Sequence, residues 1–182
     1  MYGMINDAIR EMALVELREG EWNSICASLD IPMKFGRMTT YDDEVTYQLV
    51  TSISETLGLP VDDLLKEFGK FWIQYAAKTH YGSLLKMFGS SFEECLNNLN
   101  FMHAHMGNSM PDLVPPTFVV QQETPGAVLV HYTSKRPGLA PMVIGLLDGL
   151  AAYYGRTVSV TQIDEENAAE AQGTHKFLVN LL

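Results

Sequence analysis

The spacing of apolar residues changes near residue 117, and this change limits the possible folds more than any other feature. Before it, apolar residues recur every three or four positions, as they do from Val45 to Leu57, which is typical of helices with one buried face. After it, apolar and polar residues tend to alternate, which is typical of half-buried strands. We therefore expect an α+β protein in which a helical N-terminal lobe packs on a C-terminal ββαββ lobe.

The two expected lobes belong to a single domain, residues 1–182, and meet near residue 115. In the helical lobe, Pro60 begins one helix. Ser91 and Glu94 form a capping box that begins another helix, which Gly107 should end.

The second lobe, from about residue 116 to residue 182, should contain a four-stranded antiparallel sheet and one helix. A turn at residues 123–126 should join the first two strands as a hairpin. The acidic stretch from Asp164 to Gly173 should be an exposed loop. The expected elements are the strands Thr117–Gln122 and Ala127–Arg136, the helix Leu139–Tyr154, and the strands Arg156–Ile163 and Thr174–Leu181.

The composition excludes several classes of protein. Of the 182 residues, 47% are hydrophobic and 19% are charged, so the chain can bury a core and is not a disordered protein. Twelve basic residues against 22 acidic ones give a net charge of −10, so we expect repulsion from phosphate backbones and no binding of nucleic acid. An anionic ligand would therefore need a few well-placed cations.

Other features predict a cytoplasmic protein that does not insert into membranes. Cys26 and Cys95 are too few for a disulfide framework or a cysteine-rich zinc site. Asp7 and Glu11 stand where a signal peptide would be apolar. The longest apolar run, residues 139–147, is too short to cross a bilayer.

One histidine falls on the apolar face of the helix expected after Ser91. Leu96, Leu99 and His103 share a stripe, whereas His105 lies about 200° around the helix from His103, at about 100° per residue. Two interpretations of His103 are open at this point. It is either a core histidine bonded to a backbone carbonyl or a ligand of a metal or haem iron, for which neutral imidazole is well suited.

A second set of polar residues falls on the second expected strand. Residues two apart face the same side of a strand, so Tyr132, Ser134 and Arg136 should form a row of hydrogen-bond donors. A phenol, a hydroxyl and a guanidinium match a carboxylate or a phosphate. The alternative is an ordinary solvated strand face.

These motifs resemble the haem nitric oxide/oxygen binding (H-NOX) family, which includes the haem domain of soluble guanylate cyclase and bacterial stand-alone relatives. The similarity runs from the N-terminal Met-Tyr-Gly-Met-Ile to the last strand. Its most specific part is Tyr132-x-Ser134-x-Arg136, followed by Gly-Leu-Ala-Pro-Met-Val-Ile-Gly-Leu-Leu. The second part is Asn98-Leu-Asn-Phe-Met-His103-Ala-His, with Pro115-Pro116 downstream.

The resemblance implies a haem b group between the two lobes and a role for each of these residues. His103 corresponds to the proximal ligand of the haem iron. Tyr132, Ser134 and Arg136 correspond to the row that holds the propionates. Pro116 corresponds to the residue that presses on the porphyrin and distorts it.

The distal side should decide which gas is sensed. Ile5, Trp72, Met142 and Leu146 are the candidates for the distal wall. Oxygen-binding relatives have a distal tyrosine at the position that corresponds to Met142, and a methionine has no donor for bound dioxygen. The indole N–H of Trp72 is a possible donor, although Trp72 is at least as well explained as core filler.

The resemblance therefore implies a sensor of nitric oxide and CO that is not an enzyme. Nitric oxide would weaken the bond from iron to His103, the porphyrin would relax against Ile5 and Pro116, and the lobes would move. Because the sequence ends at Leu182 without an output domain, we expect a separate partner: a histidine kinase, a cyclic-di-nucleotide enzyme or a guanylate-cyclase-like output. Some relatives carry a zinc site near the C-terminus, but His175 has no cysteine beside it, so none is expected here.

Three alternatives remain. The first is an oxygen-binding haem sensor. The second is a haem catalyst of the peroxidase or nitric oxide dioxygenase type, which the mostly apolar distal wall disfavours because such catalysts need polar groups or a stable oxygen complex. The third is a haem-free module that uses the row of donors for another carboxylate or for phosphate.

Overall fold

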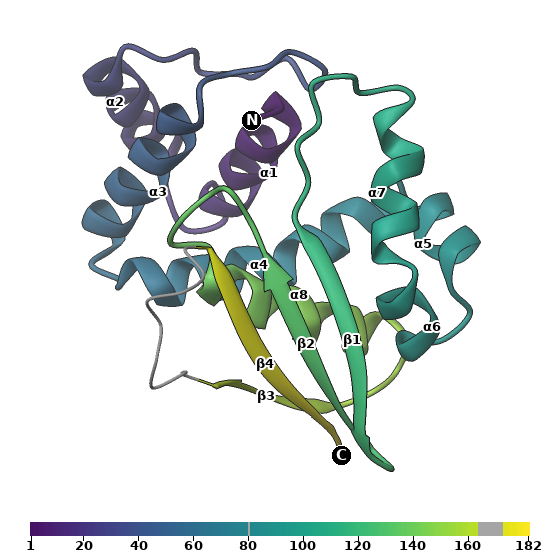
Figure 1. Cartoon of the computed structure of the whole chain (residues 1–182). Helices are drawn as coiled ribbons and strands as arrows, with labels where there is room; N and C mark the ends of the chain where they lie inside the picture. The colour runs from purple at the N-terminus through teal and green to yellow at the C-terminus, as the bar shows by residue number, and fades with distance from the viewer. Residues whose placement is uncertain (80, 164–172) are drawn as a thin grey trace. The chain divides into compact units, whose positions relative to one another are not determined.

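The structure is a computed structural model that describes residues 1–79, 81–163 and 173–182 (Figure 1). Nearly all of the acidic loop expected at residues 164–173 lies outside the described residues. The chain divides into two units, residues 1–68 and 69–182. This division does not coincide with the lobe boundary expected near residue 115. The difference arises because Leu85, Phe92 and Leu96, from helices before that boundary, join the core of the sheet.

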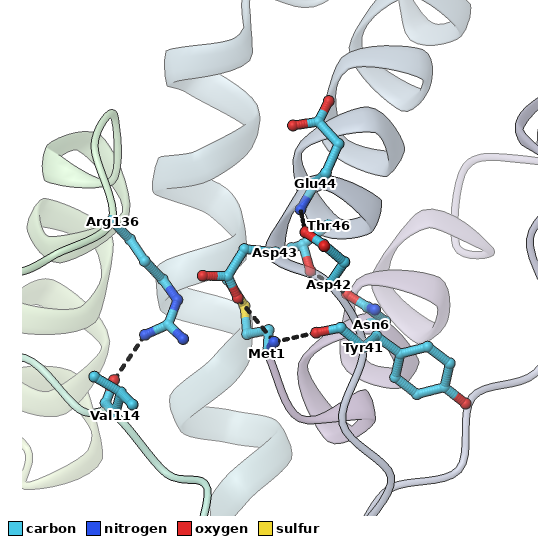
Figure 2. A network of polar contacts seen from close by, with 9 residues as sticks. All are labelled: Met1, Asn6, Tyr41, Asp42, Asp43, Glu44, Thr46, Val114 and Arg136. Atoms are coloured by element: carbon cyan, nitrogen blue, oxygen red, sulfur yellow. Dashed lines mark hydrogen bonds and ion pairs between the residues drawn. The ribbon is translucent and has the colours of Figure 1, made fainter.

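The first unit is helical. Asp42 accepts a hydrogen bond from the Glu44 N–H at 3.0 Å and so begins one helix, which Gly58 ends with a φ of +65°. A buried hydrogen bond of 2.7 Å from the Thr46 hydroxyl to the Asn6 carbonyl oxygen joins the first helix to the third. Both residues are labelled in Figure 2. The elements are α1 (Gly3–Ala13), α2 (Glu19–Leu29), α3 (Asp43–Leu57) and the start of α4 (Val61–Lys78), which continues into the second unit.

The second unit contains the expected four-stranded antiparallel sheet, in the strand order β1-β2-β4-β3. The β1–β2 hairpin is confirmed, and Gly126, with a φ of +94°, lies in its turn. Helix α8 leads from β2 to β3, which confirms the ββαββ order. The elements are β1 (Thr117–Thr124), β2 (Ala127–Thr133), α8 (Ala140–Tyr153), β3 (Val158–Ile163) and β4 (Thr174–Leu181).

One face of this sheet and α8 form the core of the second unit. Figure 1 shows α8 behind the sheet. Val130, Phe177 and Val179 of the sheet pack in one cluster with Val143 and other apolar residues of α8. Full burial of such side chains stabilises the fold by about 1.5–3 kcal/mol each. None of the helices in the described part of the chain combines the length and apolar character needed to cross a membrane.

The helix expected from Ser91 to Gly107 is two helices, so this prediction was wrong in part. The capping box is present, because the Ser91 hydroxyl accepts from the Glu94 N–H at 3.2 Å. The break falls at Asn98, whose side chain donates to the Phe88 carbonyl at 2.9 Å. A short helix before the capping box was not predicted. The helices are α5 (Gly82–Phe88), α6 (Phe92–Asn97) and α7 (Leu99–Gly107).

Candidate functional site

His103 lies on α7 and is half-buried, whereas His105 of the same helix is exposed. The Nδ1 atom of His103 is buried and has no hydrogen-bond partner among the described residues. Burial lowers the pKa of the imidazole, and the nearby backbone of Pro116 opposes part of this shift. Burial therefore favours the neutral imidazole, which is the form that binds a metal.

Phe118 lies between His103 and the polar set of Tyr132, Ser134 and Arg136. Its ring centroid is 6.2 Å from that of His103 and 5.5 Å from that of Tyr132. Phe118 and Tyr132 are also direct partners in the β1–β2 ladder. Helix α7 and the end of β2, which are far apart in sequence, are thus brought together across one aromatic side chain.

Tyr132, Ser134 and Arg136 come together as predicted, but not on one strand. Strand β2 ends at Thr133, so only Tyr132 belongs to it, and the expected strand end at Arg136 was wrong. The Arg136 N–H donates to the Ser134 hydroxyl at 3.0 Å and closes a turn at the end of the strand. The Arg136 side chain donates to the Val114 carbonyl at 2.7 Å, as Figure 2 shows.

The electrostatics of this set suit an anion. Tyr132 is 3% exposed, and burial raises the pKa of its phenol. A hydrogen bond with Ser134 and the positive charge of Arg136 act in the opposite direction. A phenol, a hydroxyl and a guanidinium within reach of one another can bind a carboxylate.

The distal candidates of the second unit lie on α4 and α8, which cross in close contact. A Cβ atom on Gly69 of α4 would lie 2.2 Å from the Met142 carbonyl oxygen of α8. Leu146 follows Met142 by one turn. Trp72 is half-buried and stacks on Tyr75, with a centroid distance of 5.8 Å and an interplanar angle of 22°. Both interpretations of Trp72, as donor and as core filler, stay open.

Ile5, the remaining candidate, lies half-buried on α1 in the first unit. Its expected contact with a porphyrin stays a prediction. One residue that sequence reasoning missed is Asn100, which bonds both backbone groups of Phe118. Asn100 lies inside the motif around His103, but no periodic pattern indicates a bond to a strand that follows much later in the chain.

The sequence and the fold of the chain are similar to those of known proteins. Residues 2–162 match the model of the family described as Haem-NO-binding. The chain therefore belongs to this family of haem-based gas sensors, the H-NOX domains.

Its curated relatives include soluble guanylate cyclases. The chain is 26% identical to gcy-35 of Caenorhabditis elegans, over 91% of this chain and 25% of that protein. It is 32% identical to gcy-37 of the same organism, over 81% of this chain and 21% of that protein. The chain thus spans at most a quarter of the length of these relatives.

Solved H-NOX structures confirm the α+β fold. The H-NOX protein from S. oneidensis in the Fe(II)NO ligation state superposes with a TM-score of 0.87 at 17% identity, covering 100% of this chain and 99% of that one. The Fe(II) unliganded H-NOX protein from K. algicida gives a TM-score of 0.83 at 19% identity, covering 100% and 97%. At these identities the comparison speaks for the fold alone.

The residues present fit the haem that H-NOX domains bind. A neutral imidazole with an unsatisfied buried nitrogen suits a haem iron, whose usual protein ligand is a histidine. The donors near Tyr132 suit the propionates, which are carboxylates. The aromatic face of Phe118 between the two sets suits a flat, apolar macrocycle.

Proposed function

We propose that this chain binds haem b, with His103 as the iron ligand, and senses nitric oxide and CO at the ferrous iron. The observation that carries the proposal is the buried Nδ1 atom of His103, which has no hydrogen-bond partner among the described residues and lies one aromatic ring away from the polar set at Tyr132. The haem would supply the iron at which the gas binds. Pro116, close to His103, would press on the porphyrin.

The polar set at the end of β2 would hold the propionates. Arg136 provides the positive charge that an acidic chain of net charge −10 needs at this point. Tyr132 and Ser134 provide neutral donors beside it. The three groups would hold the macrocycle against Phe118 and so keep its iron within reach of His103.

The decisive experiment replaces His103 by glycine. His103→Gly should lose haem during purification and regain it when imidazole is added, because free imidazole then fills the ligand position. His105→Gly, an exposed change on the same helix, is the matched control and should keep its haem. If His103→Gly retains haem as well as the original chain without imidazole, the ligand assignment is wrong.

Two of the distal candidates, Met142 and Leu146, support nitric oxide and CO rather than oxygen. Met142 and Leu146 offer no hydrogen-bond donor to bound dioxygen, whose partial negative charge needs one. The ferrous protein should bind nitric oxide without air-stable oxygenation, as its absorption spectrum would show. Met142→Tyr should introduce a donor and slow oxygen dissociation at least tenfold. A stable oxygen complex of the original chain would favour the oxygen-sensor alternative instead.

We also infer that the chain signals and does not catalyse. A separate protein, such as a histidine kinase, a cyclic-di-nucleotide enzyme or a guanylate-cyclase-like output, must then bind the two ligation states with different affinity. Equal affinity with and without nitric oxide would contradict the role for that partner. Peroxide turnover should not exceed that of free haem. The free, buried cysteines Cys26 and Cys95 suit a reducing, cytoplasmic setting.

A further inference from the structure

Asn100 makes two hydrogen bonds to a single residue of another element. Its Oδ1 atom accepts from the Phe118 N–H at 3.0 Å, and its Nδ2 atom donates to the Phe118 carbonyl at 2.6 Å. Asn100 is nevertheless an exposed residue on α7. Exposed asparagines are usually tolerant of substitution. Two hydrogen bonds to one backbone residue make Asn100 an exception.

The partner of this amide is the edge of the sheet. Among the strands that the structure describes, β1 has β2 on one side only, because it is the first strand in the order β1-β2-β4-β3. The two backbone groups of Phe118 bond Asn100 and so belong to the free edge of β1. The Asn100 amide supplies one acceptor and one donor, as a neighbouring strand would, and thereby completes the edge at this residue.

These bonds add to the apolar packing of α7, in which Leu99 and Met102 are partly buried against the core. No residue of α7, all of which the structure describes, is buried. The N-terminal end of the helix is fixed through side-chain amides: Asn98, which begins it, bonds the Phe88 carbonyl at the end of α5, and Asn100 bonds β1. His103 follows Asn100 by three residues, which places both on the same side of a helix. The ring of His103 accordingly lies 6.2 Å from the ring of Phe118, the residue that Asn100 bonds.

We propose that Asn100 is a positioning residue that fixes α7 to β1 and thereby sets where the His103 imidazole lies relative to Pro116 and Tyr132. Pro116 precedes Phe118 by two residues on the same chain segment, and Tyr132 is the ladder partner of Phe118. One amide therefore fixes the helix of the candidate iron ligand against the strand that aligns the other candidate haem contacts. The role toward iron rests on the proposed function of His103, whereas the attachment of α7 to β1 does not.

The first experiment needs no haem. Amide hydrogen exchange at Phe118 reports the bond to Asn100 directly in the haem-free chain. The leucine side chain has nearly the same shape as that of asparagine but makes no hydrogen bonds, so Asn100→Leu should speed this exchange at least tenfold. Asn97→Leu is the matched control, because the Asn97 side chain donates to the Glu93 carbonyl within its own helix, and it should leave the exchange unchanged. Unchanged exchange in Asn100→Leu would overturn the proposal.

The second experiment reports the position of His103. In the ferrous haem-loaded protein, Asn100→Leu should weaken the iron–histidine stretching signal in the resonance Raman spectrum and speed haem loss several-fold, with Asn97→Leu as control. Asn100→Asp, which keeps the acceptor but loses the donor, should fall between Asn100→Leu and the original chain and provides a second variant if Asn100→Leu folds poorly. An Asn100→Leu protein with the original stretching signal and haem loss would overturn the positioning role.

The two proposals fail in different ways. If His103→Gly keeps its haem without imidazole, the proposed function fails, and the exchange at Phe118 still decides whether Asn100 attaches α7 to β1. If His103→Gly loses its haem while Asn100→Leu leaves the iron–histidine signal unchanged, the proposed function stands and the positioning role of Asn100 is overturned.

Discussion

Helices α7 and α8 both carry candidate haem contacts, but they are held in the second unit by different forces. Six residues of α8 are buried, and α8 approaches α4 so closely that Gly69 has no room for a side chain. In α7, as the structure describes it from end to end, no residue is buried, and two asparagine side chains tie its first turn to its neighbours. Figure 1 shows α8 against the sheet and α7 beside β1.

This difference suggests that α8 is the more rigid helix and α7 the more movable one. Apolar packing is spread over many contacts, so it gives α8 one rigid position from which to form a wall. A helix held by a few directional bonds can shift when one of them changes, because local stability is low where few apolar groups are buried. Under the proposed function of His103, the second arrangement would let α7 shift when a gas binds. The following predictions test this comparison.

The largest difference should appear at two glycines. Gly69→Val should destabilise the protein by about 4 kcal/mol, because its Cβ atom would lie 2.2 Å from the Met142 carbonyl oxygen, a backbone atom of α8. At Gly107, in the last turn of α7, no described atom would lie within 4 Å of an added Cβ. Gly107→Ala should therefore change the stability by less than about 1 kcal/mol, in the stabilising direction. Urea unfolding measures both values.

A Gly69→Val protein as stable as the original chain would contradict the close crossing of α4 and α8. Gly20→Val is a useful control for the substitution itself, because an added Cβ there also meets nothing within 4 Å. Its cost should be limited to the intrinsic preferences of the two residues in a helix, which differ little.

Leucines of the two helices should show a smaller difference. Leu147→Ala on α8 should cost about 3 kcal/mol of unfolding free energy, because Leu147 is 2% exposed and its removal leaves a cavity in the core. Leu99→Ala on α7 should cost about 1 kcal/mol, because Leu99 is only partly buried at the edge of that core. Equal losses at the two positions would show that α7 depends on packing as much as α8 does.

The smallest effect concerns pH. Burial lowers the pKa of His103 in the folded chain, so the unfolded chain binds a proton more readily below the ordinary histidine pKa of about 6.5. The stability of protein prepared without haem should therefore fall as the pH is lowered from about 7 to about 5. His103→Leu should reduce this slope. A slope that is the same in the original chain and in His103→Leu would contradict the burial of His103.

Elements with a long regular pattern could be predicted from the sequence. The strand Thr174–Leu181 has the predicted bounds, and the helix predicted at Leu139–Tyr154 is α8, one residue shorter at each end. The helix after Ser91 was less predictable. Its apolar pattern is continuous, but the Asn98 side chain bonds the Phe88 carbonyl ten residues earlier and the helix breaks there. Such competition from a side chain is not visible in the periodicity.

The candidate site shows the same limit. The residue types of the row at Tyr132 were predicted, and the three polar groups do lie together. The reason was different from the expected one, because a turn after Thr133, and not the alternation of a strand, brings Ser134 and Arg136 to Tyr132. Which side of a strand a residue faces is local information, but where the strand ends depends on its neighbours.

The sequence by itself determined the order and type of most elements, the apolar faces of the helices, and the identity of His103 and its companions as candidates. These properties follow from periodicity and residue chemistry, which act over a few positions. The tertiary structure decided which elements meet. It placed Phe118 between His103 and Tyr132, and it paired Asn100 with a residue 18 positions later. Contacts of this kind form only after distant segments have packed, so no local pattern in the chain can specify them.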